Sequence, residues 1–147
     1  PRAAAFEPRF SLCAVMGANH GWGEMQERRM QREGENPVPH YWDHVMWVFG
    51  KPNIEEFMAW APEMTLDGVV DRIKVPFLVT HGAGDRQIPL EYAHQSFGQA
   101  VNSPDKELRI FTEEDFEIEH CGADNGTVAR DFIADWIAER FRTRTSA

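Results

Sequence analysis

Short apolar runs in this chain are separated by stretches whose apolar residues recur every three or four positions. The runs at 10–16 (FSLCAVM) and 75–80 (VPFLVT) are bounded by polar residues or glycine, which is typical of buried strands. Residues 107–112 (ELRIFT) alternate between polar and apolar side chains, as a strand does. We therefore predict three strands.

Helical patterns fill the intervals between these strands. Proline in the first turn favours a helix start, and Asn53 is a good N-cap for the stripe that follows it. The predicted helices cover 1–9, 40–49, 53–60, 65–73, 89–101 and 126–142. The charged segment 17–39 is expected to be irregular, with helix only at 23–32.

Strands that alternate with helices imply an α/β fold, with a parallel sheet covered on both faces. Residues 1–16 and 65–147 would form this core, and 17–64 would be a helical insertion. A three-stranded parallel sheet leaves a long exposed edge. We therefore expect further strands from sequence before Pro1, in an N-terminal half of the same protein.

Composition narrows the function classes. The net charge of −9 argues against binding to nucleic acid or to an anionic membrane surface. Two cysteines are too few for a disulfide framework, no apolar run is long enough to span a bilayer, and no signal peptide is evident, so we expect a cytoplasmic protein. His40, Asp43 and His44 could suggest a metal, since histidines at i and i+4 face the same way on a helix. No HExxH glutamate or third ligand is evident, and we expect neither metal nor cofactor.

Two polar residues follow neighbouring predicted strands. Asp85 comes directly after the run at 75–80, and is either a carboxylate that orients a histidine or an ordinary turn residue. His120 lies in the loop after the next strand, and is either a general base or a surface histidine. Adjacent strand ends are about 5 Å apart, so these loops can meet.

The order strand–Asp–helix–strand–His–helix resembles the C-terminal part of the α/β-hydrolases. His81–Pro89 (HGAGDRQIP) is similar to the HGxxDxxxP segment of that superfamily. The resemblance implies that Asp85 is the triad acid and His120 the base. It also implies a helical cap over 17–64.

Pro1–Phe10 (PRAAAFEPRF) resembles the helix that follows the nucleophile elbow in one branch of the superfamily. That branch holds the 2,6-dihydroxypseudooxynicotine hydrolase, fungal pigment-pathway hydrolases that shorten polyketides, and nearby esterases. The resemblance implies cleavage of a C–C bond next to a ketone, or of an ester, in an aromatic or polyketide-like small molecule. A serine peptidase is a further alternative, and a homodimer is left open.

No serine of this sequence has the context expected of the nucleophile. Ser11, expected in a strand, and Ser96, expected in a helix, lack a Gly-x-Ser-x-Gly context, as do Ser103 and Ser146. We expect the nucleophile before Pro1. The alternative is a non-catalytic fragment or a degenerate hydrolase-like binding module.

Several other residues carry weaker expectations. An aromatic segment could pack as a buried helix or line a substrate pocket; the residues expected at the substrate are Trp22, Tyr41, Trp42, Val45 and Met46. His81 is expected to be structural. The side chains of His120 and Cys121 should diverge, so we expect no Cys–His nucleophile pair. The acidic run Glu113–Glu119 is expected to be a solvated loop, with a carboxylate that assists His120 as the alternative.

Overall fold

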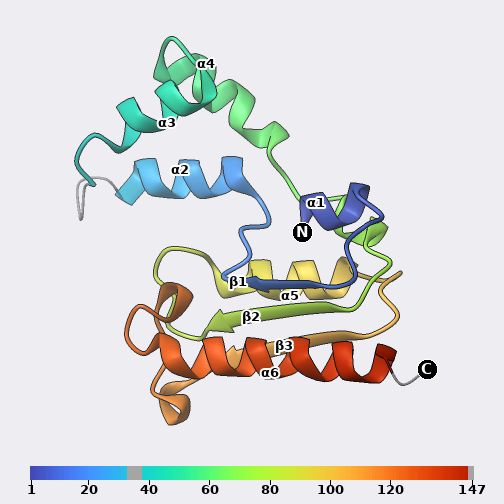
Figure 1. Ribbon diagram of the computed structural model, residues 1–147. Helices are drawn as coiled ribbons and strands as arrows, with labels where there is room; N and C mark the ends of the chain where they lie inside the picture. The colour runs from blue at the N-terminus through green and yellow to red at the C-terminus, as the bar shows by residue number, and fades with distance from the viewer. Residues whose placement is uncertain (33–37, 146–147) are drawn as a thin grey trace. The chain divides into compact units, whose positions relative to one another are not determined.

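The computed structural model describes residues 1–32 and 38–145, so residues 33–37 of the irregular segment and Ser146 lie outside the described residues. The chain divides into two compact units (Figure 1). Unit 1 comprises Pro1–His20 and Leu66–Ala147, and unit 2 comprises Gly21–Thr65. Each unit is described by itself.

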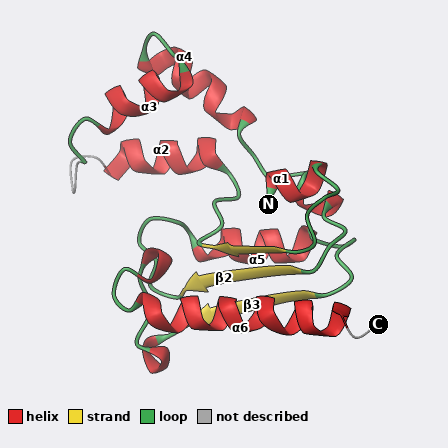
Figure 2. Ribbon diagram, in the orientation of Figure 1, coloured by secondary structure: helices red, strands yellow, loops and turns green. Residues whose placement is uncertain are grey.

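Unit 1 is built on a three-stranded parallel sheet with the order β1-β2-β3 (Figure 2). The strands are β1 (Cys13–Met16), β2 (Phe77–Gly82) and β3 (Lys106–Phe111). Every residue of the central strand β2 is buried, as expected for an apolar run in a covered parallel sheet. The three predicted strands are confirmed, although β1 begins three residues late and Ser11 lies in a bend before it.

Helices α5 (Leu90–Gln99) and α6 (Gly126–Thr145) cover opposite faces of this sheet (Figure 1). Leu108 and Ile110 of β3 pack with the core that contains Ala93 of α5. The alternate residue Glu107 accepts a hydrogen bond from Trp136 Nε1 of α6 at 2.9 Å. Because successive side chains of a strand point to opposite faces of the sheet, β3 contacts both helices.

The first helix, α1 (Arg2–Phe6), is shorter than predicted. Glu7 is extended (φ −112°, ψ 107°), and it precedes Pro8, whose ring disfavours helical backbone in the residue before it.

The helix predicted over 65–73 is wrong. Only a 3₁₀ turn forms there, at Val70–Arg72, because Gly68 adopts a left-handed backbone (φ 64°) that interrupts the helical path. The apolar residues of the segment are nevertheless buried: Leu66, Val69, Val70 and Ile73.

Unit 2 consists of α2 (Trp22–Arg32), α3 (Tyr41–Phe49) and α4 (Ile54–Trp60), followed by a 3₁₀ turn at Ala61–Glu63. The Asn53 side chain caps α4, since its oxygen accepts a hydrogen bond from Glu56 N at 2.8 Å. Phe57 is fully buried within an aromatic cluster, with its ring centroid 5.4 Å from that of Trp22. This packing gives the small unit a core of its own.

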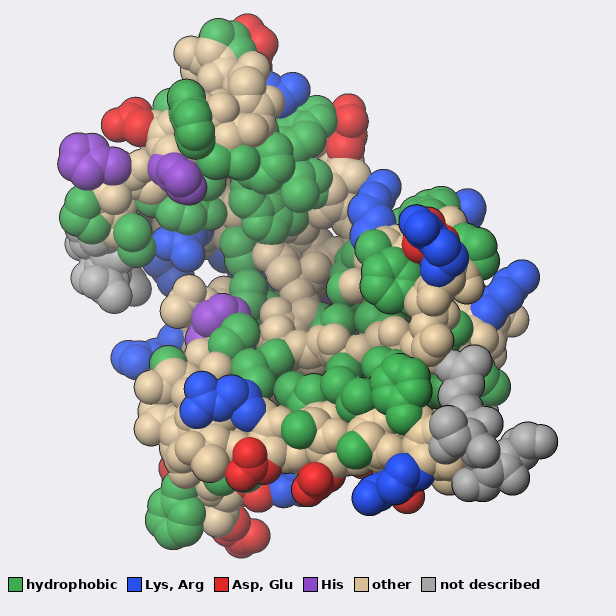
Figure 3. All heavy atoms as spheres, in the orientation of Figure 1, with side chains coloured by type: hydrophobic (Ala, Val, Ile, Leu, Met, Phe, Trp, Pro, Cys, Tyr) green, Lys and Arg blue, Asp and Glu red, His purple; other side chains and the backbone are tan. Residues whose placement is uncertain are grey.

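Hydrophobic side chains also reach the surface of unit 2 (Figure 3). The side chain of Trp47 in α3 is 80% exposed. None of the described helices is both long and apolar enough to cross a bilayer.

Candidate active site

The three strands of unit 1 end at the same edge of the sheet. Gly17 N donates to Thr80 O at 2.9 Å, and Ala83 N donates to Phe111 O at 2.8 Å, so the ladder continues one residue past β1 and β2. The turns that follow β2 and β3 therefore start side by side. In open parallel sheets, functional groups gather at this edge.

Asp85 lies in the turn after β2, with its side chain only 1% exposed. Its Oδ1 atom accepts hydrogen bonds from the backbone N–H groups of Gln87 at 2.8 Å and Ile88 at 2.9 Å. The sequence left open whether Asp85 is a turn residue or a carboxylate that orients a histidine. Its Oδ1 atom stabilises the turn, and its Oδ2 atom remains available to bond a histidine.

The imidazole of His120 meets that second oxygen. His120 Nδ1 lies 2.8 Å from Asp85 Oδ2, and the His120 side chain is 27% exposed. A carboxylate only accepts hydrogen bonds, so Nδ1 carries the proton and donates it. In the neutral ring, Nε2 is then the unprotonated nitrogen and can act as a base.

Glycines allow the two turns to approach this closely. A Cβ atom on Gly82 would lie 2.3 Å from the backbone oxygen of Ile118. Gly84 N donates to that same oxygen at 2.9 Å. The glycines of HGAGD therefore leave room for the loop that carries His120, a role that the sequence pattern alone does not assign.

The residue that follows β1, Gly17, packs against the imidazole of His120. Gly17 has a left-handed backbone (φ 61°), and a Cβ there would lie 3.3 Å from His120 Cε1. A glycine directly after a predicted strand was the available signal, but the sequence does not show which loop packs against it.

The expectation that His120 and Cys121 diverge is wrong. Cys121 has φ 51°, which turns its side chain back, and its Sγ lies 3.4 Å from His120 Nε2. Divergence applies to extended backbone, and Cys121 is not extended. Burial, with a smaller contribution from the charge of Asp85, raises the pKa of the Cys121 thiol, which favours the neutral form.

His81 at the end of β2 is 1% exposed and donates from Nε2 to Ile88 O at 3.1 Å. Burial lowers the pKa of His81, and the nearby Asp85 carboxylate opposes that shift. The neutral ring holds the turn on which Asp85 lies.

The acidic run Glu113–Glu119 is only partly a solvated loop. Glu113–Asp115 forms a 3₁₀ turn with a capping box to Thr112, whereas the Glu117 residue is 2% exposed. The charge of Glu117 led us to expect a side chain exposed to solvent. The side chain is buried instead, because it accepts a hydrogen bond from Ala129 N of α6, which lies further along the chain.

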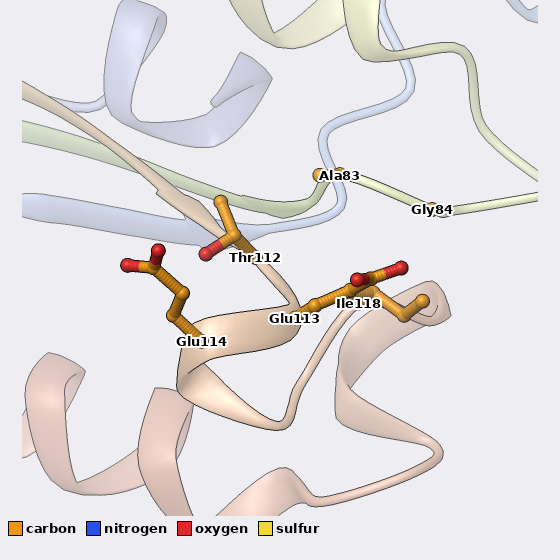
Figure 4. Close-up of a pocket in the computed structure, with 6 residues that line it drawn as sticks. All are labelled: Ala83, Gly84, Thr112, Glu113, Glu114 and Ile118. Atoms are coloured by element: carbon orange, nitrogen blue, oxygen red, sulfur yellow. The ribbon is translucent and has the colours of Figure 1, made fainter.

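A hollow of about 550 Å³ lies between the turns after β2 and β3 (Figure 4). Ala83 and Gly84 line it from one turn, and Thr112, Glu113, Glu114 and Ile118 line it from the other. Neither Asp85 nor His120 lines this hollow.

The five residues expected at the substrate all lie in unit 2. Val45 is buried, with Trp22, Tyr41, Trp42 and Met46 packed around the same cluster. Tyr41 also donates a hydrogen bond to Gln26 Oε1 at 2.7 Å. These packing contacts and this hydrogen bond lie within unit 2, and the role of the five residues at a substrate stays a prediction.

Among the described residues, no group of three or more His, Cys, Asp or Glu side chains is arranged so that it could hold a metal ion. His40 Nδ1 lies 3.9 Å from Asp43 Oδ2, at the exposed start of α3.

Comparison of the sequence with protein-family models and with curated proteins finds no match. Comparison of the structure finds the esterase Pf2001 of Pyrococcus furiosus, with a TM-score of 0.65 and 16% identity over 97% of this chain. A second crystal form gives a TM-score of 0.63 and 12% identity. Est1E from Butyrivibrio proteoclasticus matches 59% of this chain and 33% of its own, with 17% identity and a TM-score of 0.48.

The chain has part of the α/β-hydrolase fold. It spans about half of the Pyrococcus esterase, since the match covers 48% of that protein. The predicted fold class is thereby confirmed. The resemblance to the pigment-pathway branch remains a prediction.

Ser96 and Ser103 bond groups other than the His120 imidazole. Ser96 is buried in α5, with its Oγ 2.9 Å from His20 Nδ1. Ser103 Oγ donates to Val75 O at 2.9 Å. These hydroxyl groups serve packing and turns.

Proposed function

We propose that this chain supplies the acid and the base of a serine-dependent hydrolase that acts at a carbonyl carbon. The observation that carries the proposal is the 2.8 Å contact between His120 Nδ1 and the buried Oδ2 of Asp85, at the shared edge of the strands. The carboxylate fixes the tautomer of the ring and stabilises the imidazolium that forms during reaction.

The proposed chemistry uses Nε2 of His120. A serine hydroxyl, from sequence before Pro1, attacks the carbonyl carbon and gives its proton to Nε2. When the tetrahedral intermediate collapses, the same proton passes to the leaving group. Water, activated by His120, then releases the acyl group and regenerates the serine.

Two bond classes fit this sequence of steps. A carboxylic ester releases an alcohol, and a β-diketone releases a carbanion equivalent that His120 protonates. The branch resemblance favours a C–C bond next to a ketone, and the fold similarity to the Pyrococcus esterase is compatible with an ester. Peptide cleavage is a third candidate within the same mechanism.

The five unit 2 side chains are proposed as substrate contacts on the sequence pattern alone. We propose that Trp22, Tyr41, Trp42, Val45 and Met46 favour an aromatic or polyketide-like substrate. Truncation of Trp42 to alanine should raise KM for an aryl substrate more than for an acetate of a short alcohol. Equal effects on both substrates would contradict this assignment.

The deciding experiment is a hydrolase assay of the full-length protein with aryl esters and β-diketones. We expect His120→Ala and Asp85→Asn each to lower kcat/KM by about 10³-fold or more. His94→Ala and Asp131→Asn are matched controls, because both residues are exposed on helices. Full activity of His120→Ala or of Asp85→Asn would refute the assignment of these residues as base and acid. A wild-type protein that binds these compounds without hydrolysing them would favour a binding module.

A further inference from the structure

Glu117 is a buried carboxylate that the proposed chemistry leaves unused. It is 2% exposed and belongs with the most deeply buried large side chains. Among the side chains of residues 1–32 and 38–143, no ion pair involves it. Burial of a charged side chain without an ion pair is costly, so such a group requires a specific set of hydrogen bonds.

The Glu117 carboxylate binds the start of α6. Its Oε2 atom accepts a hydrogen bond from Ala129 N at 2.8 Å. Ala129 is the fourth residue of a helix that begins at Gly126, and the first four N–H groups of a helix have no acceptor within it. Glu117 therefore satisfies one of these groups, and its negative charge is stabilised by the positive N-terminal end of the helix dipole.

The loop then folds back over the same carboxylate. Gly122 has φ 68°, and a Cβ atom there would lie 2.8 Å from Glu117 Oε1. His120 lies between these two residues in sequence. The loop that presents the imidazole is thus closed by the contact of Gly122 with Glu117.

A second carboxylate, that of Asp124, stabilises the same loop by hydrogen bonds to its backbone. Asp124 accepts hydrogen bonds from the backbone of Ile118 at 2.8 Å and of Glu119 at 3.2 Å. These bonds hold the loop to itself, whereas the bond from Ala129 ties it to α6. The Glu117 side chain therefore connects the part of the loop next to His120 to α6.

We propose that Glu117 is a positioning residue, which holds the His120 loop on α6 so that Nδ1 stays on Asp85. The proposal deepens the proposed function and rests on it for its effect on hydrolysis. Its effect on the imidazole itself does not depend on any hydrolytic activity.

The electrostatics of Glu117 agree with a role in position and not in proton transfer to substrate. Burial is the main cause that raises its pKa. Asp124 and Asp115 raise it further, while the bond from Ala129 N and the charge of Arg130 lower it. The carboxylate faces the protein interior, and its described contacts are with α6 and its own loop.

The test compares Glu117→Leu with Glu117→Gln in the full-length protein. Leucine removes the acceptor and keeps much of the volume, whereas glutamine keeps a carbonyl oxygen for Ala129 N. We expect Glu117→Leu to lower kcat/KM on an aryl ester by about 10²-fold, with a smaller change in KM, because misplacement of about 1 Å has that effect. We expect Glu117→Gln to stay within a few-fold of wild type. Glu114→Leu, an exposed position in the same loop, should change neither quantity.

An NMR measurement of the His120 Nδ1 proton tests this proposal separately from the proposed function. In wild type and Glu117→Gln, the Nδ1 proton should show the downfield signal of a bond to a carboxylate, and Glu117→Leu should lose it. If wild type hydrolyses nothing, the proposed function fails, but the NMR measurement still decides on Glu117. A folded Glu117→Leu protein with the wild-type His120 signal would overturn the proposal.

Glu117→Leu could fail to fold, and Gly122→Ala then replaces it. The added methyl group lies against Glu117 Oε1 and strains a left-handed backbone, so it disturbs the same contact with a smaller change in burial. Loss of the Nδ1 signal is the expected result. An unchanged signal and unchanged kcat/KM in Gly122→Ala would refute the role of this contact.

Discussion

Replacement of Gly82 by alanine should separate the His120 loop from the turn that carries Asp85. The added Cβ would lie 2.3 Å from Ile118 O, 2.6 Å from Ile118 C and 2.8 Å from Glu119 O. All three are backbone atoms, so no side-chain rotation can relieve the overlap. The backbone at Gly82 is that of a strand, and the effect is therefore steric and not conformational.

The size of the displacement follows from these distances. Ordinary contact begins at 3.4 Å, so the loop has to retreat by about 1.1 Å, the difference between 3.4 and 2.3 Å. His120 Nδ1 and Asp85 Oδ2 are 2.8 Å apart, and a retreat of this size that moved His120 away from Asp85 would take the two atoms beyond hydrogen-bond distance. We expect kcat/KM to fall by about 10²-fold. Overpacking of this kind should lower the free energy of unfolding by about 1–3 kcal/mol.

The assay measures kcat/KM on an aryl ester and Tm for the full-length protein, with Gly98→Ala as the control. Gly98 lies in α5, and a Cβ there meets nothing within 4 Å. Because alanine favours helix over glycine by about 1 kcal/mol, Gly98→Ala should leave activity unchanged and hold or raise Tm. If Gly82→Ala kept both the activity and the Tm of wild type, the close approach of the two turns would be incorrect.

Two further predictions concern stability. Asn53→Ala removes the oxygen that accepts from Glu56 N, and should cost about 1 kcal/mol, visible as faster hydrogen exchange of the α4 amides; unchanged exchange would contradict the cap. Burial lowers the pKa of His81, so the unfolded chain binds more protons just below pH about 6.5, and the free energy of unfolding should fall as pH falls through that range. Urea titrations at several pH values measure how steeply the free energy of unfolding changes with pH. His81→Asn should reduce this slope without abolishing it, because burial lowers the pKa of His20 as well. Identical slopes in the variant and in wild type would refute the contribution of His81.

The strands were predictable because their signals are local. The apolar run before His81 forms the buried centre of the sheet, and the alternation at 107–112 matches a strand between two helices. The helix at 65–73 was not, since its apolar spacing is helical but Gly68 leaves the helical region. Apolar spacing reports burial, and burial does occur there without a helix.

The candidate site divides in the same way. That Asp85 and His120 follow adjacent strands is evident from sequence order, and their proximity follows from parallel topology. The fit of Ile118 against Gly82, the backbone of Cys121 and the bond from Ala129 to Glu117 join residues by three-dimensional contact. No residue pattern along one chain specifies such contacts.

The two-sided use of β3 limits how this region can vary. Leu108 and Ile110 face one helix, and Glu107 faces the other. Insertion or deletion of one residue within β3 would exchange these faces, and would direct a carboxylate toward the apolar interior. Length changes should therefore be tolerated in the exposed turn around Glu113 and Glu114 but not in the strand that leads to it.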